Sequence, residues 1–164
     1  MRKSGEVTAA EIEDAPDGFQ QLRAMLDGKQ NAPMGDTLGF RLAEVERGHV
    51  VFEGAPDRSV FNPLGYVHGG YAATLLDSAC AMAVHSQLGP NRGHTTLELK
   101  VSYQRGLSDR SGTVRATGRV VSVGRRVAFS EGTLHDGEGR LCATATATLL
   151  VFDVEAPEGA LRPG

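Results

Sequence analysis

Aromatic side chains and cysteine are scarce in this chain of 164 residues. Aromatics make up 5% of the sequence and tryptophan is absent, so a core has to be built mainly from valine, leucine and alanine. The two cysteines, Cys80 and Cys142, lie inside apolar segments and have no CxxC partner. This pattern favours two buried free thiols of a cytosolic protein over a disulfide or a redox pair.

A strong excess of charge of one sign is also missing. Seventeen basic and twenty acidic side chains leave a formal charge of −3, so no nucleic-acid partner is expected. The distribution is uneven, because residues 92–140 contain nine Arg or Lys and five Asp or Glu. That half of the chain is therefore the place to look for a site that binds an anion.

Long apolar runs are absent too. No stretch of about 18 apolar residues occurs, and the polar, acidic start MRKSGEVTAAEIEDAPDG has no apolar segment typical of a signal peptide. We therefore expect a cytoplasmic protein without a membrane partner. The length suits one domain. We place this domain at residues 35–152, after an N-terminal tail and short helix (1–34) and before a loose C-terminal tail (153–164).

Periodicity predicts two helices and six strands. Apolar residues at helical spacing predict a short helix at 19–29, ended by Gly28, and a longer one at 69–88, before Gly89-Pro90. Alternation on both sides of Arg47-Gly48 predicts a β-hairpin at 38–52, and residues 57–68 are expected to form a loop. The other strands are expected at 94–107, 112–124, 126–136 and 140–152.

The longer helix is apolar nearly all the way round, so it belongs in the middle of the fold. The short links between the last four strands predict antiparallel neighbours in a meander. The economical architecture is an α+β fold in which a curved antiparallel sheet of about six strands wraps round one long central helix.

An acid in this apolar helix is the sharpest clue to function. Asp77 lies among Leu75, Leu76, Ala79 and Cys80, where an unpaired carboxylate would cost several kcal/mol. Two explanations are open. Asp77 pairs with a group at a subunit interface, or it serves as a general base or nucleophile.

His68-Gly69-Gly70 stands where the same helix should begin. The first N–H groups of a helix lack intrahelical acceptors and carry the positive end of its dipole, and glycine lets another group approach the backbone. This arrangement can polarise a carbonyl as an oxyanion site does, although a plain tight turn into the helix would have the same sequence.

Gly69 and Asp77 are eight residues apart. That spacing separates them by roughly 12 Å along a helix axis, too far for one chain to bring both to a single carbonyl. Two such helices side by side and antiparallel in a symmetric dimer would bring Asp77 of one subunit to Gly69 of the other. We therefore expect an obligate homodimer with shared sites.

The stretch NPLGYVHGG (62–70), the acid at 77 and the strand TTLELKVSYQRG (95–106) together resemble the hotdog-fold acyl-CoA thioesterases. The phenylacetyl-CoA and 4-hydroxybenzoyl-CoA thioesterase branch is the most similar. VSVGRRVAFSEGTLHDGEGRLCATATAT (121–148) is similar to the final hairpin of that group. The resemblance covers about residues 35–152. It departs at residues 104–107, QRGL, where the family often has an Arg-Pro pair.

The resemblance implies the hotdog fold and a set of catalytic roles. Gly69 N–H would polarise the thioester carbonyl, and Asp77 of the partner subunit would act as general base for water or as nucleophile. Asn62 would orient the water or the acyl group. His68 would fix the loop and the helix start rather than act as a base. The family commonly pairs its dimers into tetramers.

The resemblance also implies residues that bind the substrate and the water. Thr96, or Thr95 if the alignment shifts by one, would hold the water, and Gly70 would lie beside the substrate. The turn Gly124-Arg125-Arg126 would lie near the nucleotide end of coenzyme A, whose phosphates suit two guanidinium groups. Ordinary exposed turn charges are the alternative for both arginines.

The resemblance therefore implies hydrolysis of an acyl-CoA thioester, aryl or of short to medium chain length, to a free acid and CoA. The five histidines show no metal-ligand spacing and no GxSxG, GxGxxG or P-loop motif occurs, so neither metal nor cofactor is expected. The rivals are a hotdog hydratase or dehydratase of enoyl or hydroxyacyl thioesters, which needs a His and an acid acting together, and a non-catalytic acyl-CoA-binding module, which needs no buried acid.

Overall fold

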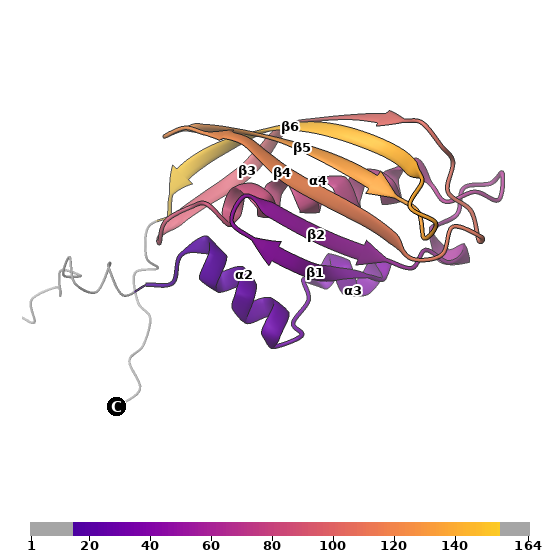
Figure 1. Cartoon of the computed structure of the whole chain (residues 1–164), viewed down its shortest axis with the longest axis horizontal. Helices are drawn as coiled ribbons and strands as arrows, with labels where there is room; N and C mark the ends of the chain where they lie inside the picture. The colour runs from indigo at the N-terminus through magenta and orange to yellow at the C-terminus, as the bar shows by residue number, and fades with distance from the viewer. Residues whose placement is uncertain (1–14, 155–164) are drawn as a thin grey trace, which may run out of the picture.

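Helix α4 (Gly69–His85) runs along the concave side of a six-stranded antiparallel sheet in the computed structural model, which describes residues 15–154 (Figure 1). This is the predicted α+β architecture. Residues 1–14 of the predicted N-terminal segment (1–34) and residues 155–164 of the predicted C-terminal tail lie outside the described residues. In chain order the other elements are α2 (Gly18–Asp27), α3 (Pro33–Leu38), β1 (Phe40–Glu46), β2 (His49–Gly54), η1 (Arg58–Val60), β3 (Arg92–Tyr103), β4 (Val114–Val123), β5 (Val127–His135) and β6 (Leu141–Asp153).

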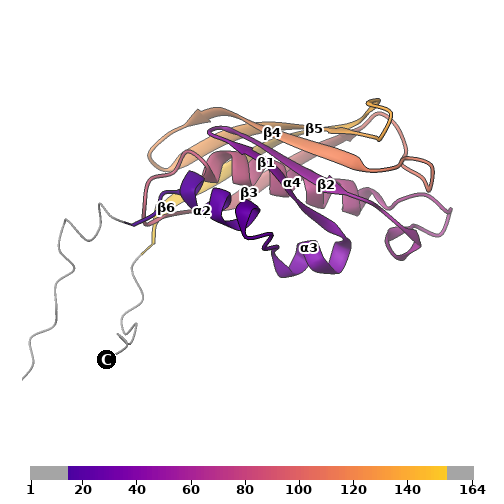
Figure 2. The ribbon, with the colours of Figure 1, turned by 60° about the horizontal axis from the view of Figure 1, so that its bottom comes forward.

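The predicted first helix is α2, and its ends follow local capping rules. Asp17 accepts a hydrogen bond from Gln20 N–H (2.8 Å), and the Gln20 side chain accepts one from Asp17 N–H (2.9 Å). This reciprocal pair is a capping box. The helix ends at Gly28, whose N–H donates to Ala24 O at 2.9 Å. Its buried Leu22 joins the core, and Figure 2 shows α2 beside β1 and below α4.

Helix α3 was not predicted. It begins at Pro33, a residue favoured in the first helical turn, and ends at Gly39, whose φ of +68° suits glycine. Leu38 therefore belongs to a helix and not to the first strand of the hairpin. The boundary predicted between residues 34 and 35 falls inside α3. Pro33 and Gly39 were signals of this helix, but the strand-like alternation that predicted β1 begins at Leu38 and overlaps the end of α3.

The sheet has the strand order β1-β2-β4-β5-β6-β3 with antiparallel pairing throughout. The hairpin at Arg47-Gly48 and the β4-β5-β6 meander are confirmed. The prediction that β3 neighbours β4 is wrong, because β3 pairs with β6 at the far edge. Strand β3 ends at Tyr103, because the N–H groups of Gln104 and Arg105 both donate to Cys142 O. Residues 104–113 then cross to β4.

Two glycines opposite each other let the sheet approach α4 closely. Gly118 of β4 pairs with Gly132 of β5. A Cβ atom at Gly118 would collide with the Ala79 carbonyl of α4, and one at Gly132 would lie 2.9 Å from Cys80 Sγ. The small residues of α4 and the glycines of the sheet are thus complementary. The buried face of α4 consists of Tyr71, Ala72, Leu75, Leu76, Ala79, Cys80, Ala81, Ala83 and Val84.

The C-terminal end of α4 lies three residues before the predicted position of 88. Ser86 is the C-cap, and its hydroxyl donates to Ala83 O (2.7 Å) while accepting from Gly48 N–H (2.7 Å). The hydroxyl therefore ties the helix end to the β1–β2 turn, which periodicity alone does not reveal.

No helix within residues 15–154 is both long and apolar enough to cross a bilayer.

A half-buried histidine pair lies at the C-terminal end of α4. The rings of His85 and His94 meet edge to face with centroids 5.3 Å apart, and neither Nδ1 has a hydrogen-bond partner among the described residues. Burial, and secondarily the charge of His85, lowers the pKa of His94 to about 4. Burial also lowers the pKa of His85. The native fold thus favours neutral rings here.

The wild-type chain should lose stability in mild acid through His94. Between the ordinary histidine pKa of 6.5 and about 4, the unfolded chain binds a proton that native His94 does not. The stabilisation by neutral His94 is therefore complete above pH 6.5 and is lost as the pH falls to about 4. We expect the free-energy difference between wild type and His94→Gln to shrink by about 1–2 kcal/mol between pH 7.5 and 4.5 in urea unfolding. Parallel pH profiles would contradict this.

Candidate active site

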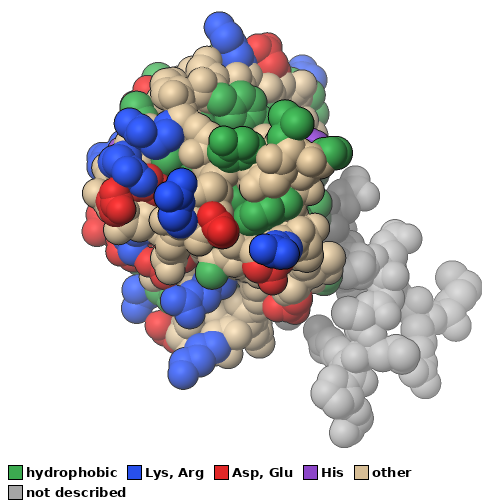
Figure 3. All heavy atoms as spheres, turned by 90° about the vertical axis from the view of Figure 1, so that its right-hand side faces the viewer, with side chains coloured by type: hydrophobic (Ala, Val, Ile, Leu, Met, Phe, Trp, Pro, Cys, Tyr) green, Lys and Arg blue, Asp and Glu red, His purple; other side chains and the backbone are tan. Residues whose placement is uncertain are grey.

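A cavity of about 220 Å³ lies at the N-terminal end of α4, between the loop at 57–68 and the end of β3. It brings together three of the predicted site residues, Asn62, His68 and Gly69. Figure 3 views the molecule from this end, the right-hand side of Figure 1, and apolar side chains gather there among basic and acidic ones. The cavity is lined by Asn62, Tyr66, Val67, His68, Gly69, Ala72, Tyr103, Arg105, Gly106, Leu107, Leu134, Cys142 and Ala143.

Asn62 holds the loop that covers the cavity. Its Oδ1 accepts from the backbone N–H groups of Leu64 (2.9 Å) and Tyr66 (3.2 Å), and its own N–H donates to Tyr66 O (2.7 Å). An asparagine that bonds its own turn in this way stabilises a tight loop. Its side-chain NH₂ group has no acceptor within residues 15–154 and remains available for a ligand in the cavity.

His68 is the N-cap of α4. Its Nδ1 accepts from Gly70 N–H at 2.8 Å, and its carbonyl accepts from Tyr71 N–H at 3.0 Å. An accepting Nδ1 implies a neutral ring with the proton on Nε2. His68 therefore accepts hydrogen bonds from two of the first N–H groups of the helix, and these bonds fix the start of the helix.

Gly69 N–H is the one early amide of α4 that these bonds leave out. Gly70 N–H and Tyr71 N–H are both engaged by His68, whereas Gly69 N–H meets no acceptor among the described residues. Gly69 is the first residue of the helix, so this N–H lies at the positive end of the helix dipole. It can therefore donate to a carbonyl oxygen of a ligand in the cavity.

Asp77 and Thr96 meet each other away from this cavity. Thr96 Oγ1 donates to Asp77 Oδ1 at 3.0 Å, and both side chains are half-buried. Thr95 is exposed and makes no such contact, so Thr96 is the threonine beside the acid. Asp77 does not line the cavity at Gly69. The spacing of eight residues between Gly69 and Asp77 keeps the two groups apart within one chain, as the helical geometry predicts.

The Gly124-Arg125-Arg126 turn lies at the opposite end of the molecule, at the left of Figure 1. Gly124 N–H closes the β4–β5 turn by donating to Val127 O (2.8 Å), and Arg92 donates to Arg125 O (2.6 Å). Both arginine side chains are exposed and neither forms an ion pair within residues 15–154. The structure thus presents two unpaired guanidinium groups far from the cavity of their own chain.

The apolar residues that line the cavity, and the aromatic ring of Tyr103 on one side of it, were not predicted from the sequence. Tyr103 lies at the end of β3 and donates from its hydroxyl to Gly69 O at 2.9 Å. Burial raises the pKa of the Cys142 thiol, so this cysteine serves as an apolar wall and not as a nucleophile. Tyr103 shares the inward register of Leu99 and Val101, and that alternation was the signal available in the sequence.

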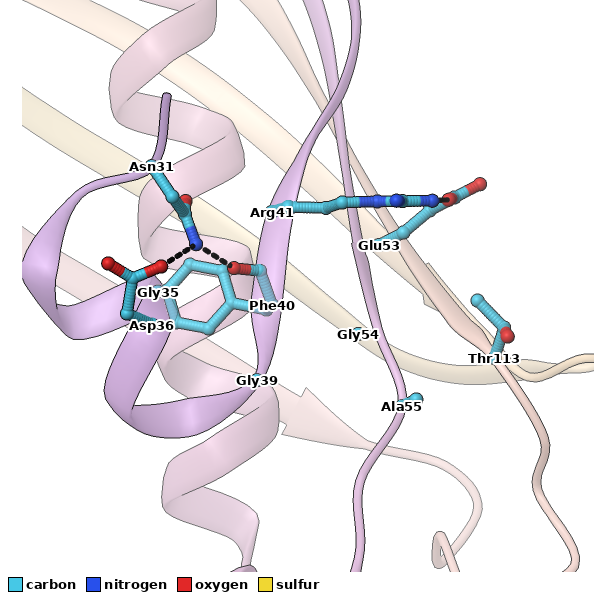
Figure 4. A pocket seen from close by; sticks show the side chains of 10 residues that line it. All are labelled: Asn31, Gly35, Asp36, Gly39, Phe40, Arg41, Glu53, Gly54, Ala55 and Thr113. Atoms are coloured by element: carbon cyan, nitrogen blue, oxygen red, sulfur yellow. Dashed lines mark hydrogen bonds and ion pairs between the residues drawn. The ribbon is translucent and has the colours of Figure 1, made fainter. Parts of the chain in front are cut away.

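A second, larger cavity of about 480 Å³ lies between α3, β1 and β2 and contains none of the predicted residues (Figure 4). Its polar side chains are satisfied by one another. Asn31 donates to Phe40 O (2.8 Å) and to Asp36 (3.2 Å), and Arg41 pairs with Glu53 at 3.1 Å. Within residues 15–154, no three His, Cys, Asp or Glu side chains are grouped as metal ligands. The cavity at Gly69 is therefore the candidate site.

Comparison with known proteins agrees with this assignment. The family model described as the thioesterase superfamily matches residues 64–143, which include Gly69, Asp77 and Thr96. A 1,4-dihydroxy-2-naphthoyl-CoA hydrolase of Listeria monocytogenes is 25% identical over 71% of this chain and 93% of its own length.

Two solved structures extend the similarity to the fold. A phenylacetic acid degradation-related protein of Ralstonia eutropha JMP134 is 32% identical, with a TM-score of 0.70 over 79% of this chain and 98% of that one. A protein of Streptococcus mutans UA159, solved bound to acetyl CoA, is 26% identical, with a TM-score of 0.64 over 72% of this chain and 92% of that one.

Proposed function

The chain belongs to the thioesterase superfamily and is an acyl-CoA thioesterase of the hotdog fold, and we propose that Gly69 and Asp77 of two subunits form its site. The reaction converts an acyl-CoA thioester and water into a carboxylic acid and free CoA. The observation that carries the proposal is Gly69 N–H, the early amide of α4 that meets no acceptor within residues 15–154, beside an apolar cavity. That N–H polarises the thioester carbonyl and stabilises the oxyanion that forms when the carbonyl carbon is attacked.

Asp77 of the partner subunit supplies the attack. It either removes a proton from the attacking water or adds to the acyl carbon itself to form an anhydride that water then hydrolyses. Thr96 Oγ1, 3.0 Å from Asp77, is the hydroxyl beside this carboxylate and orients the carboxylate or the water. The NH₂ group of Asn62 orients the water or the acyl group. The reaction uses only these side chains, the substrate and water, with no metal or cofactor.

A symmetric dimer is part of this proposal. Strand β3 is an edge of the sheet along its twelve residues, and it lies against the face of α4 that carries Asp77. Two β3 edges that pair antiparallel satisfy each other's backbone groups and bring the two α4 helices side by side. Exposed apolar side chains on β5 and β6, Val127, Phe129 and Phe152, support further pairing into a dimer of dimers.

The arginine turn fits the same dimer. It lies at the C-terminal end of its own α4, so an antiparallel partner brings it toward the cavity end of the first subunit. Arg125 and Arg126 would there face the phosphates of coenzyme A, with Gly124 keeping the turn tight.

A cytoplasmic location is supported by the free, buried thiols of Cys80 and Cys142.

The cavity favours a small acyl group. Its volume of about 220 Å³ is below the roughly 300–1,000 Å³ of pockets that hold drug-sized ligands, and its floor is Ala72, Leu107, Leu134, Cys142 and Ala143. An aromatic ring or a short to medium chain fits such a space. A hydratase or dehydratase is disfavoured, because His68 Nδ1 is engaged by Gly70 and the ring caps the helix.

The proposed activity is tested by CoA release from benzoyl-CoA, butyryl-CoA and palmitoyl-CoA. We expect the wild type to release CoA from the first two, and Asp77→Asn to lower kcat at least 100-fold, because the amide neither accepts the proton nor attacks. If the wild type releases CoA from none of the three substrates, the proposed activity is contradicted. An unchanged kcat in Asp77→Asn would show that Asp77 takes no part in the mechanism. In single turnover in ¹⁸O water, label entering Asp77 identifies the anhydride route.

The shared site is tested by mixing two inactive variants. Gly69→Pro removes the N–H where proline is tolerated, because Gly69 opens the helix and His68 is extended with ψ of 136°. Gly69→Ala retains the N–H and is the matched control. When Gly69→Pro and Asp77→Asn chains are unfolded and refolded together, about a quarter of wild-type activity should return, because half the dimers carry one intact site. No recovery, or a monomer in sedimentation at micromolar concentration, contradicts sharing.

The role of the arginine turn is tested by Arg125→Ala and Arg126→Ala. Each should raise KM for benzoyl-CoA about 3-fold with kcat unchanged, because exposed ion pairs contribute less than 1 kcal/mol. The same variants should leave KM unchanged for S-benzoyl pantetheine, which lacks the nucleotide. Arg119→Ala, an exposed arginine further along β4, is the control. Equal effects on both substrates would contradict a nucleotide contact.

A further inference from the structure

We propose that Tyr103 is a positioning residue that holds the peptide following Gly69, so that the free Gly69 N–H keeps its direction into the cavity. The inference rests on the proposed function of that N–H. It assigns a role to a residue on a strand that is distant in sequence from the His-Gly-Gly segment. The observation behind it is the hydrogen bond from Tyr103 Oη to Gly69 O at 2.9 Å.

The peptide between Gly69 and Gly70 is held at both of its polar ends. Its carbonyl accepts from Tyr103 Oη (2.9 Å), and its N–H donates to His68 Nδ1 (2.8 Å). Two adjacent glycines have more backbone freedom than any other pair, so this segment would otherwise sample several orientations. The two side chains therefore remove freedom at the position where an oxyanion donor has to be pre-aligned.

The tyrosine ring also contacts the backbone it holds. A Cβ atom at Gly69 would lie 3.2 Å from Tyr103 Cζ and Oη, so the ring lies directly over the glycine. Tyr103 lines the same cavity as Asn62, and 56% of its surface is exposed in the single chain. The ring thus closes one side of the cavity, and the hydroxyl holds the Gly69 carbonyl, which the Gly69 Cα joins to the Gly69 N–H.

Strand β3 consequently contacts α4 at both proposed functional points. Thr96 donates to Asp77 near the middle of the helix, and Tyr103 donates to Gly69 at its start. The two hydroxyl groups come from one continuous strand that runs antiparallel to the helix. A shift of β3 would therefore disturb the base and the oxyanion donor together, which couples the edge of the sheet to the reaction.

The test compares two removals of a tyrosine hydroxyl. Tyr103→Phe keeps the ring and loses only the hydrogen bond to Gly69 O. Tyr71→Phe, on α4, is the matched control, because the buried Tyr71 hydroxyl has no partner within residues 15–154 and the side chain does not line the cavity. Each full-length variant is assayed for CoA release from benzoyl-CoA beside the wild type, with its thermal midpoint measured.

We expect Tyr103→Phe to lower kcat roughly 10- to 100-fold with KM within about 2-fold of wild type, because a misaligned donor weakens transition-state stabilisation more than binding. Tyr71→Phe should retain wild-type kcat. In amide hydrogen exchange by NMR, the Gly70 N–H should exchange faster in Tyr103→Phe than in Tyr71→Phe, since its peptide has lost one of two restraints.

The outcomes separate this inference from the function on which it rests. A wild type that releases CoA, with kcat and Gly70 exchange unchanged in Tyr103→Phe, overturns the positioning role and leaves the thioesterase proposal standing. A rise in KM equal to the loss of kcat/KM, with kcat unchanged, also overturns it, because Tyr103 would then bind the substrate uniformly. A wild type that releases no CoA overturns the proposed function and the inference together.

Discussion

Helix α4 is apolar on nearly every side, and the rest of the structure depends on covering it. Its alanines and Cys80 let the sheet approach to backbone contact, and the glycine pair Gly118 and Gly132 lies where β4 and β5 cross the helix. The sheet has to curve to surround such a helix, which leaves β3 at one edge and β1 at the other. The edge at β3 lies beside the one flank of α4 that carries a charged group.

The proposed chemistry depends on two positions along α4, its start and its middle. At the start of the helix, His68 accepts from two early N–H groups, and that of Gly69 has no acceptor among the described residues and lies beside an apolar cavity. Two turns further on, Asp77 accepts from Thr96 on β3. A rigid helix cannot bring its own two groups together, which is why we propose a site shared between two antiparallel helices. The central helix thereby accounts for the fold and for the donor, and its length is the reason for the partner subunit in this proposal.

Much of the fold could be predicted because its signals are local. The capping residues of α2, the alternation of β1 and β2 around Gly48, and the turns of the β4-β5-β6 meander are each contained within a few residues. The short helix α3 was missed because a strand-like alternation overlapped its Pro and Gly signals. The pairing of β3 was mispredicted because a long crossover replaces the expected turn, and the bonds that end β3 go to Cys142, about forty residues further along.

The sequence by itself determined the central helix, the acid within it, the glycine pair at its start and the spacing that separates them. These depend on periodicity and on residue type, and both are properties of neighbouring residues. Only the tertiary structure decided that Thr96 and not Thr95 meets Asp77, that Tyr103 holds the Gly69 carbonyl, and that the cavity is small and apolar. Those facts depend on the register of β3 against α4 and β6, and a register between segments distant in the chain is set by the packing of the whole core.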